Sequence, residues 1–165
     1  MSIRFEGNCK VRLTSKALPK IPTYWFTVKV YDTAESLCRA AAKYEGEQYS
    51  EWTGPGAASG VFHSVDISDK RPLYLGVMRL CDQFMSPELI IHESVHAACA
   101  LARAYTGGPL ILGGDNVDTE EIVAYATECI SIPLIDSPVL TGSPHFLSDA
   151  PLRYPGQPPP VPVAA

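Results

Sequence analysis

Residues 86–107 read SPELIIHESVHAACALARAYTG and contain the signals of one long helix. Ser86 is a residue type preferred at a helix N-cap, and Pro87 is favoured in the first helical turn. Gly107 is suited to end the helix because glycine adopts the left-handed backbone conformation without strain. The segment therefore predicts a helix over Pro87–Thr106, of about five turns.

The middle of this helix carries the pattern His-Glu-x-x-His, formed by His92, Glu93 and His96. Residues four apart on a helix differ by about 40° in direction and about 6 Å along the axis, so one ion can bind both imidazoles. Glu93 lies one step around the helix, where its carboxylate can reach a water held on the ion and act as a general base. The pattern predicts a catalytic Zn²⁺ site with His92 and His96 as ligands.

A chance match is the competing interpretation, in which one histidine makes a buried polar contact and Glu93 faces solvent. The motif falls in the middle of a helix, and the residues on both sides of it are apolar. They predict a helix that is buried nearly all round, and burying three polar groups there without partners would be costly. The metal site is therefore the favoured interpretation.

A catalytic zinc site needs a third protein ligand and a vacant fourth position. In the metzincin pattern a glycine stands three residues after the second histidine, and a third histidine stands six residues after it. Here those positions hold Cys99 and Ala102. The third ligand is therefore expected from another element.

A second helix is predicted over residues 119–132 and is ended by Pro133. The stretch DTEEIVAY at residues 118–125 contains its candidate cap and its first turns. With this helix, residues 86–132 resemble the gluzincin class of zinc metallopeptidases, whose second helix supplies a glutamate ligand followed three residues later by a small residue. The resemblance implies Glu121 as the third ligand, with Ala124 as the small residue. Glu120 is the alternative ligand, and a capping box between Asp118 and Glu121 is the competing structural account.

Within this class the chain is most similar to compact single-domain metallopeptidases of bacteria and their phages, including the minigluzincin type. Thermolysin-like members carry an aspartate four residues after the ligand glutamate, which orients a zinc histidine. Tyr125 stands at that position here, so a different group must orient the histidine. Tyr125 and His145 are candidates for this supporting role or for stabilising a tetrahedral oxyanion, and His63 and Tyr154 are weaker ones.

The rest of the chain predicts an α+β fold. Residues rich in β-branched and aromatic side chains predict three strands, at 23–31, 60–67 and 73–80. Asp32 and Glu35 have the spacing of a capping box and predict a helix that reaches Tyr44. We expect a small mixed or antiparallel sheet packed on the two ligand-bearing helices, a zincin-like arrangement. The second and third strands form a hairpin, and residues 73–80 are the expected edge for an added peptide strand.

Residues 1–150 are expected to form one zincin-like domain, and residues 151–165 a proline-rich tail in polyproline-II conformation. A long surface loop is expected over residues 45–60. The five cysteines are odd in number, scattered and without a Cys-x-x-Cys pair, which argues against a disulfide framework and a cysteine-based zinc knuckle.

Net charge and hydropathy exclude two classes of partner. The formal net charge of −5 lacks the basic excess of a nucleic-acid binder. No signal-peptide pattern stands at the start, and no apolar stretch approaches the roughly 18 residues of a membrane helix. A cytoplasmic protein is therefore expected, with no nucleic acid or membrane as partner.

The predicted function is a zinc-dependent hydrolase, most specifically a metallopeptidase with Glu93 as general base and a peptide or protein as substrate. The alternative is a non-catalytic, metal-stabilised binding or scaffold protein, such as a phage-associated module. A closed structural site would need a fourth protein ligand, and the candidates are Cys99, Cys129, Asp118 and His63. An open fourth position would favour the enzyme.

Overall fold

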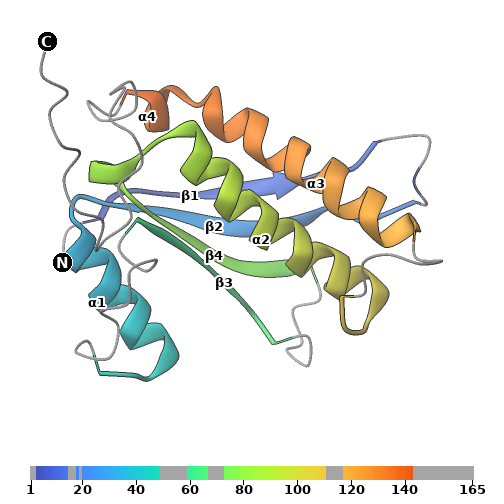
Figure 1. Cartoon of the computed structure of the whole chain (residues 1–165), viewed down its shortest axis with the longest axis horizontal. Coiled ribbons are helices and arrows are strands. Elements are labelled where there is room, and N and C mark those ends of the chain that lie inside the picture. Colours follow the sequence, from blue (N-terminus) through green and yellow to red (C-terminus); the bar gives the residue numbers. More distant parts are fainter. Residues whose placement is uncertain are drawn as a thin grey trace, which may run out of the picture.

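The computed structural model of the chain describes residues 3–14, 18, 20–48, 59–66, 73–110 and 117–142, and it has an α+β architecture (Figure 1). The elements in chain order are β1 (Ile3–Val11), β2 (Tyr24–Tyr31), α1 (Ala34–Glu45), β3 (Gly60–Ser64), β4 (Tyr74–Cys81), the short 3-10 helix η2 (Asp82–Phe84), α2 (Pro87–Thr106), α3 (Val117–Ile135) and α4 (Pro138–Thr141).

The four strands form one mixed sheet in the order β1-β2-β4-β3. β1 pairs antiparallel with β2, β2 pairs parallel with β4, and β3 pairs antiparallel with β4. Of the two expected arrangements, mixed or antiparallel, the sheet is therefore the mixed one, and the predicted β3–β4 hairpin is confirmed. The expectation that residues 73–80 form an edge is wrong, because β4 lies between β2 and β3, and β3 is the edge strand on that side.

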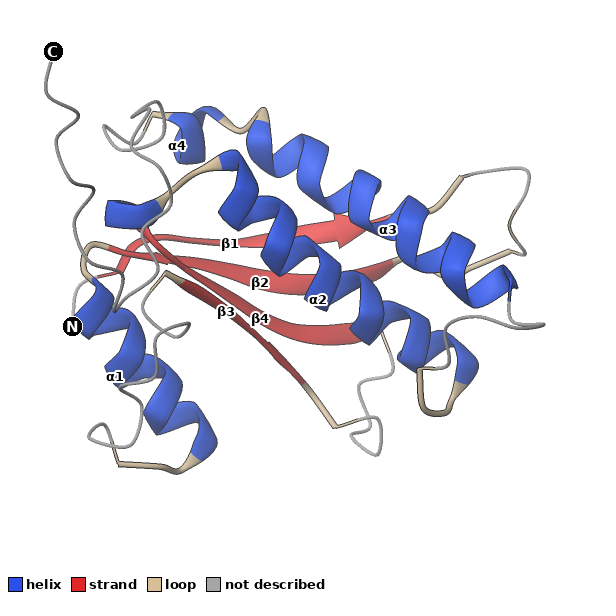
Figure 2. Ribbon diagram, in the orientation of Figure 1, coloured by secondary structure: helices blue, strands red, loops and turns tan. Residues whose placement is uncertain are grey.

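The two faces of the sheet carry different helices. α2 and α3 lie side by side over one face, and α1 covers one end of the other face (Figure 2). Side chains alternate along each strand, so one set of residues packs under α2 and α3 and the other set lies on the face that α1 covers at one end. The main core lies under α2 and α3 and includes Phe26, Met78, Leu80, Ile90, Leu101, Ile122 and Ile130. A smaller cluster under α1 contains Tyr31, Leu37, Cys38, Ala40 and Cys81.

Helix ends agree with the sequence where the capping residues are strong. α2 spans the predicted Pro87–Thr106. The N-cap of α1 is Thr33, one residue after the predicted cap Asp32. The Thr33 side chain accepts a hydrogen bond from the Ser36 backbone N–H. α3 continues past Pro133 to Ile135 instead of ending there.

Three elements lie outside the predicted set, namely β1, the 3-10 helix η2 and α4. β1 follows a clear alternation, with Phe5, Cys9 and Val11 directed to the core and polar residues between them, so a period-two pattern was available in the sequence. α4 is a single short turn of helix after α3.

Several expectations fall on residues that lie outside the described part of the chain. They concern the tail at residues 151–165, most of the expected loop at residues 45–60, and the side chains of Asp118, His145 and Tyr154. Within the described residues, no helix is long and apolar enough to cross a membrane.

Candidate functional site

α2 is fixed at both ends by its caps. The Ser86 hydroxyl accepts a hydrogen bond of 3.2 Å from the Leu89 backbone N–H, and the Gly107 N–H donates one of 2.9 Å to the Arg103 carbonyl. Gly107 has φ 69°, the left-handed conformation that glycine adopts without strain. The bounds of the helix that carries the motif are therefore set by capping residues of the chain itself.

The structure brings His92 and His96 together. Their Nε2 atoms lie 3.2 Å apart, and their rings meet edge to face with centroids 5.0 Å apart. Two nitrogens bound to one tetrahedral Zn²⁺ at about 2.0–2.1 Å would be separated by about 3.3 Å. Burial and the neighbouring His92 lower the pKa of His96, which favours the neutral form that a metal ligand requires. The two side chains fit a shared ion.

The histidines lie on an exposed side of α2, in contrast to the predicted helix buried nearly all round. Ile91 and Val95 beside them are 43% and 39% exposed within the described residues. Ser94 faces the core instead and donates a 2.7 Å hydrogen bond to the Ile90 carbonyl. The motif thus has one exposed face, which carries both histidines.

Glu93 occupies a different environment from the histidines, although it belongs to the same motif. Its side chain is only 3% exposed, and one carboxylate oxygen, Oε2, is buried without a hydrogen-bond partner within the described residues. Burial raises the pKa of the Glu93 carboxyl to about 7, although a hydrogen bond from the Phe62 backbone N–H acts in the opposite direction. A carboxyl with a pKa near 7 is matched to taking up and returning a proton at neutral pH.

Edge strand β3 forms the surface against which Glu93 lies. A Cβ atom at Gly60 would be 2.9 Å from Leu89 Cδ1 and 3.1 Å from Glu93 Oε1. Contacts below 3.4 Å leave too little space for a side chain, so the glycine allows β3 to lie close to the carboxylate. No local pattern in the sequence indicates a role for Gly60 or Phe62, because their contact with Glu93 is long-range.

No contact between Glu121 and the histidine pair is recorded among the described residues. α2 and α3 run in opposite directions (Figure 1), so the first turns of α3 lie beside the C-terminal half of α2. Glu128 lies two turns further along the same side of α3, nearer to the level of the histidines. Within the described residues, no group of three or more His, Cys, Asp or Glu side chains is arranged to hold an ion. Glu121 as third ligand therefore stays a prediction, as does the vacant fourth position.

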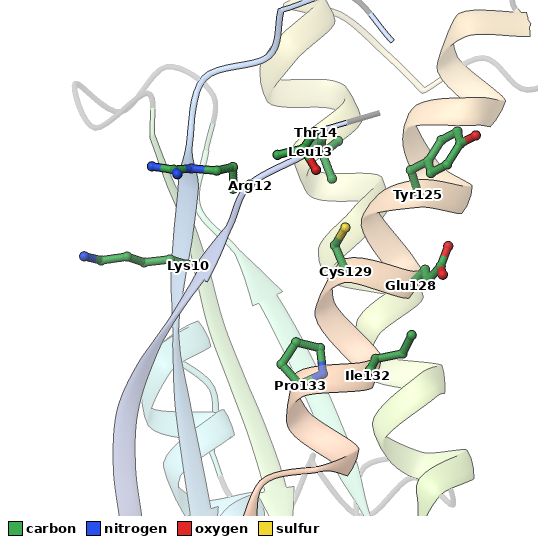
Figure 3. A pocket seen from close by; sticks show the side chains of 9 residues that line it. All are labelled: Lys10, Arg12, Leu13, Thr14, Tyr125, Glu128, Cys129, Ile132 and Pro133. Carbon is green, nitrogen blue, oxygen red and sulfur yellow. The ribbon is translucent and has the colours of Figure 1, made fainter. Parts of the chain in front are cut away.

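Tyr125 is half-buried on α3 and lines an opening of about 590 Å³ between this helix and the end of β1. Figure 3 shows that Tyr125 and Glu128 extend from the side of α3 that is turned away from Lys10 and Arg12. Its predicted supporting role toward the metal is neither confirmed nor contradicted by these contacts.

His63 lies in a separate polar cluster under α1. The Arg79 guanidinium, which can only donate, binds His63 Nδ1, and His63 Nε2 lies 2.8 Å from Glu45 Oε1. Tyr44 stacks on the imidazole at 4.9 Å and on the Arg79 guanidinium at 4.6 Å. Burial and Arg79 lower the pKa of His63, and Glu45 opposes this effect. Because both nitrogens are engaged on the face away from α2, we assign His63 a structural role.

Comparison of the chain with protein-family models, with curated proteins and with solved structures gives no match. The functional conclusion below therefore rests on the site residues and on the chemistry that their arrangement allows.

Proposed function

We propose that the chain is a zinc-dependent hydrolase, and specifically a metallopeptidase of gluzincin type with a zincin-like fold. One observation carries the proposal: two histidine nitrogens 3.2 Å apart stand beside a buried carboxyl whose pKa is raised to about 7. An ion site alone would not need a buried glutamate in the same motif, because burying an unpartnered carboxylate lowers stability.

The residues divide the work between them. His92 and His96 would hold the ion, which when bound supplies a Lewis acid and an activated water. Glu93 takes the proton from the attacking water and later passes it to the leaving amine. The Phe62 backbone N–H holds the Glu93 carboxylate in place while it does so.

The edge strand offers a way to present a substrate. β3 is five residues long, lies at the edge of the sheet, and contacts α2 through Gly60 and Phe62. An extended peptide can add to such an edge by main-chain hydrogen bonds, which are independent of its sequence. The exposed Ile91 and Val95 beside the histidines provide apolar surface for a substrate side chain.

The variant Glu93→Gln tests the division of roles. It keeps the shape of the side chain but removes the base, so hydrolysis of a peptide library should fall by about 10²–10⁴-fold while zinc content stays unchanged. Mass spectrometry of the digest and elemental analysis of the same samples give both readings. Wild-type protein that takes up no zinc on titration, or that holds zinc but cleaves nothing, would overturn the peptidase proposal.

A second experiment concerns the third ligand, which we take to be Glu121 from the resemblance alone. Zinc affinity should fall by more than about 100-fold in Glu121→Ala and stay unchanged in Glu120→Ala. Glu128→Ala is the matched control on the same side of α3. Loss of affinity in Glu128→Ala alone would instead assign the third ligand to the level of α3 that lies nearer the histidines.

A further inference from the structure

The outer edge of β1 is the longer of the two sheet edges. β1 has nine residues and β3 has five, and within the described residues no strand pairs with the outer side of β1. Proteins protect such edges with short strands, prolines or covering segments, because a free edge is a template for another strand. β1 contains no proline. Within the described residues, the backbone of β1 beyond its bulge between Ile3 and Phe5 is therefore available for pairing.

Apolar openings run along this edge. A cavity of about 590 Å³ lies between the end of β1 and α3 (Figure 3), and a second cavity of about 320 Å³ is lined by residues of β1 and α4. Lys10 and Pro133 line both. Their apolar lining includes Phe5, Cys9, Leu13, Ile132, Leu134 and Leu140. A strand added at β1 would therefore find apolar surface for the side chains on the helix-facing side.

The charges on β1 limit which strand can add. Glu6, Asn8, Lys10 and Arg12 are exposed, and Figure 3 shows Lys10 and Arg12 extending away from α3. In an antiparallel pair, directly opposed residues lie on the same face of the sheet. The twofold axis that relates two paired copies of β1 must therefore pass beside a residue, which then faces its own copy, and not beside the midpoint between two residues.

Only some of these self-pairings avoid opposing like charges. Pairing around Glu6 places that glutamate against its own copy, and pairing around Val11 brings Lys10 against Arg12. Pairing around Lys10 places that lysine against its own copy.

Pairing around Cys9 avoids these conflicts. It sets Glu6 of each copy against Arg12 of the other, so two opposite-charge pairs form across the interface. On the helix-facing side it sets Phe5 against Leu13, which lines the larger cavity. Charge and apolar surface therefore favour the same register.

We propose that the protein forms a twofold-symmetric dimer through antiparallel pairing of β1 with β1 of a second copy, centred on Cys9. The sheets of the two copies then form one continuous sheet, with the α2 helices on the same face. The interface is separate from the histidine pair and needs no metal.

The test measures the mass of the full-length chain by light scattering during gel filtration, at roughly 100 µM and with chelator present. We expect a dimer for the wild type. Glu6→Arg or Arg12→Glu alone should raise the dimer dissociation constant by roughly tenfold, because each substitution opposes like charges twice. The double reversal Glu6→Arg/Arg12→Glu should restore the wild-type value.

Two controls separate the register from simple loss of charge. Lys29→Ala removes the 3.1 Å ion pair between Lys29 and Glu6 within one chain and should leave the dimer intact. Glu6→Arg/Lys10→Glu should remain as weak as Glu6→Arg, because Lys10 does not face Glu6 in this register. A monomeric wild type, or a double reversal with Arg12 that fails to restore the dimer in folded protein, would overturn the proposal.

Discussion

Two histidine clusters lie on opposite sides of the sheet and differ in what occupies their ring nitrogens. Under α1, His63 has Arg79 at one nitrogen and Glu45 at the other. On α2, the Nε2 atoms of His92 and His96 face each other at 3.2 Å, and within the described residues neither histidine forms an ion pair with a carboxylate. The first cluster is complete within the protein, whereas the second has coordination capacity for an external ion.

The largest expected effect tests whether the two histidine clusters differ in zinc binding. His92→Ala or His96→Ala should raise the zinc dissociation constant by more than about 100-fold, because either change leaves too few ligands. His63→Ala should bind zinc like the wild type but lose about 3 kcal/mol of stability, since it leaves Arg79 buried without its acceptor. Zinc titration and urea denaturation measure the two effects. Equal loss of zinc in all three variants would erase the distinction.

Glu93→Gln provides the second test, on protein freed of metal with chelator. The folded-state pKa of Glu93, about 7, exceeds the ordinary glutamate value of 4.5, so the folded protein binds more protons than the unfolded chain between these values. Wild-type stability therefore falls as the pH rises from 4.5 through 7, by about 3 kcal/mol. The glutamine variant lacks this loss and should be the more stable protein at pH 8. Parallel stability curves for the two proteins between pH 4 and pH 9 would contradict the raised pKa of Glu93.

The sequence predicted those parts of the site whose determinants are local. The ends of α2 and the proximity of His92 to His96 follow from capping residues and helical spacing, which act within a few residues. Glu93 was predicted as the base, but its burial depends on Gly60 and Phe62 in another element. Such a long-range contact leaves no local signal.

Long-range contacts also determine most of the other features of the fold that were not predicted. The position of β4 inside the sheet depends on its parallel pairing with β2, which a hairpin pattern does not reveal. The partners of His63 come from α1 and β4, so a lone histidine in the sequence gave no indication of them. β1 was missed although its alternation was readable, because Gly7 interrupts its apolar positions.

Gly60→Ala gives the third and smaller effect, because it sharpens the role of β3 beside Glu93. The added methyl would lie 2.9 Å from Leu89 Cδ1 and 3.1 Å from Glu93 Oε1, so β3 or the carboxylate must shift. We expect a loss of about 1–3 kcal/mol in stability. Gly108→Ala is the matched control, because a Cβ there meets nothing within 4 Å, and it should change stability by less than about 0.5 kcal/mol. Equal effects of both substitutions would show that β3 does not restrict this position.

The smallest expected effect is the pH dependence of the His63 cluster. Burial and Arg79 lower the pKa of His63 below the ordinary histidine value of 6.5, so the unfolded chain binds the proton more readily than the folded protein. The stability contributed by the neutral imidazole is therefore complete above pH 6.5 and is lost as the pH falls through the folded-state pKa.

His63→Gln keeps an acceptor for Arg79 and a donor for Glu45 but does not titrate. Denaturation of metal-free wild type and variant between pH 5 and pH 8 isolates His63, because the lowered pKa of His96 contributes equally to both proteins. The variant should lose less stability on acidification. A variant that loses as much as the wild type would show that the pKa of His63 is not lowered in the folded protein, and that Glu45 offsets the effects of burial and Arg79.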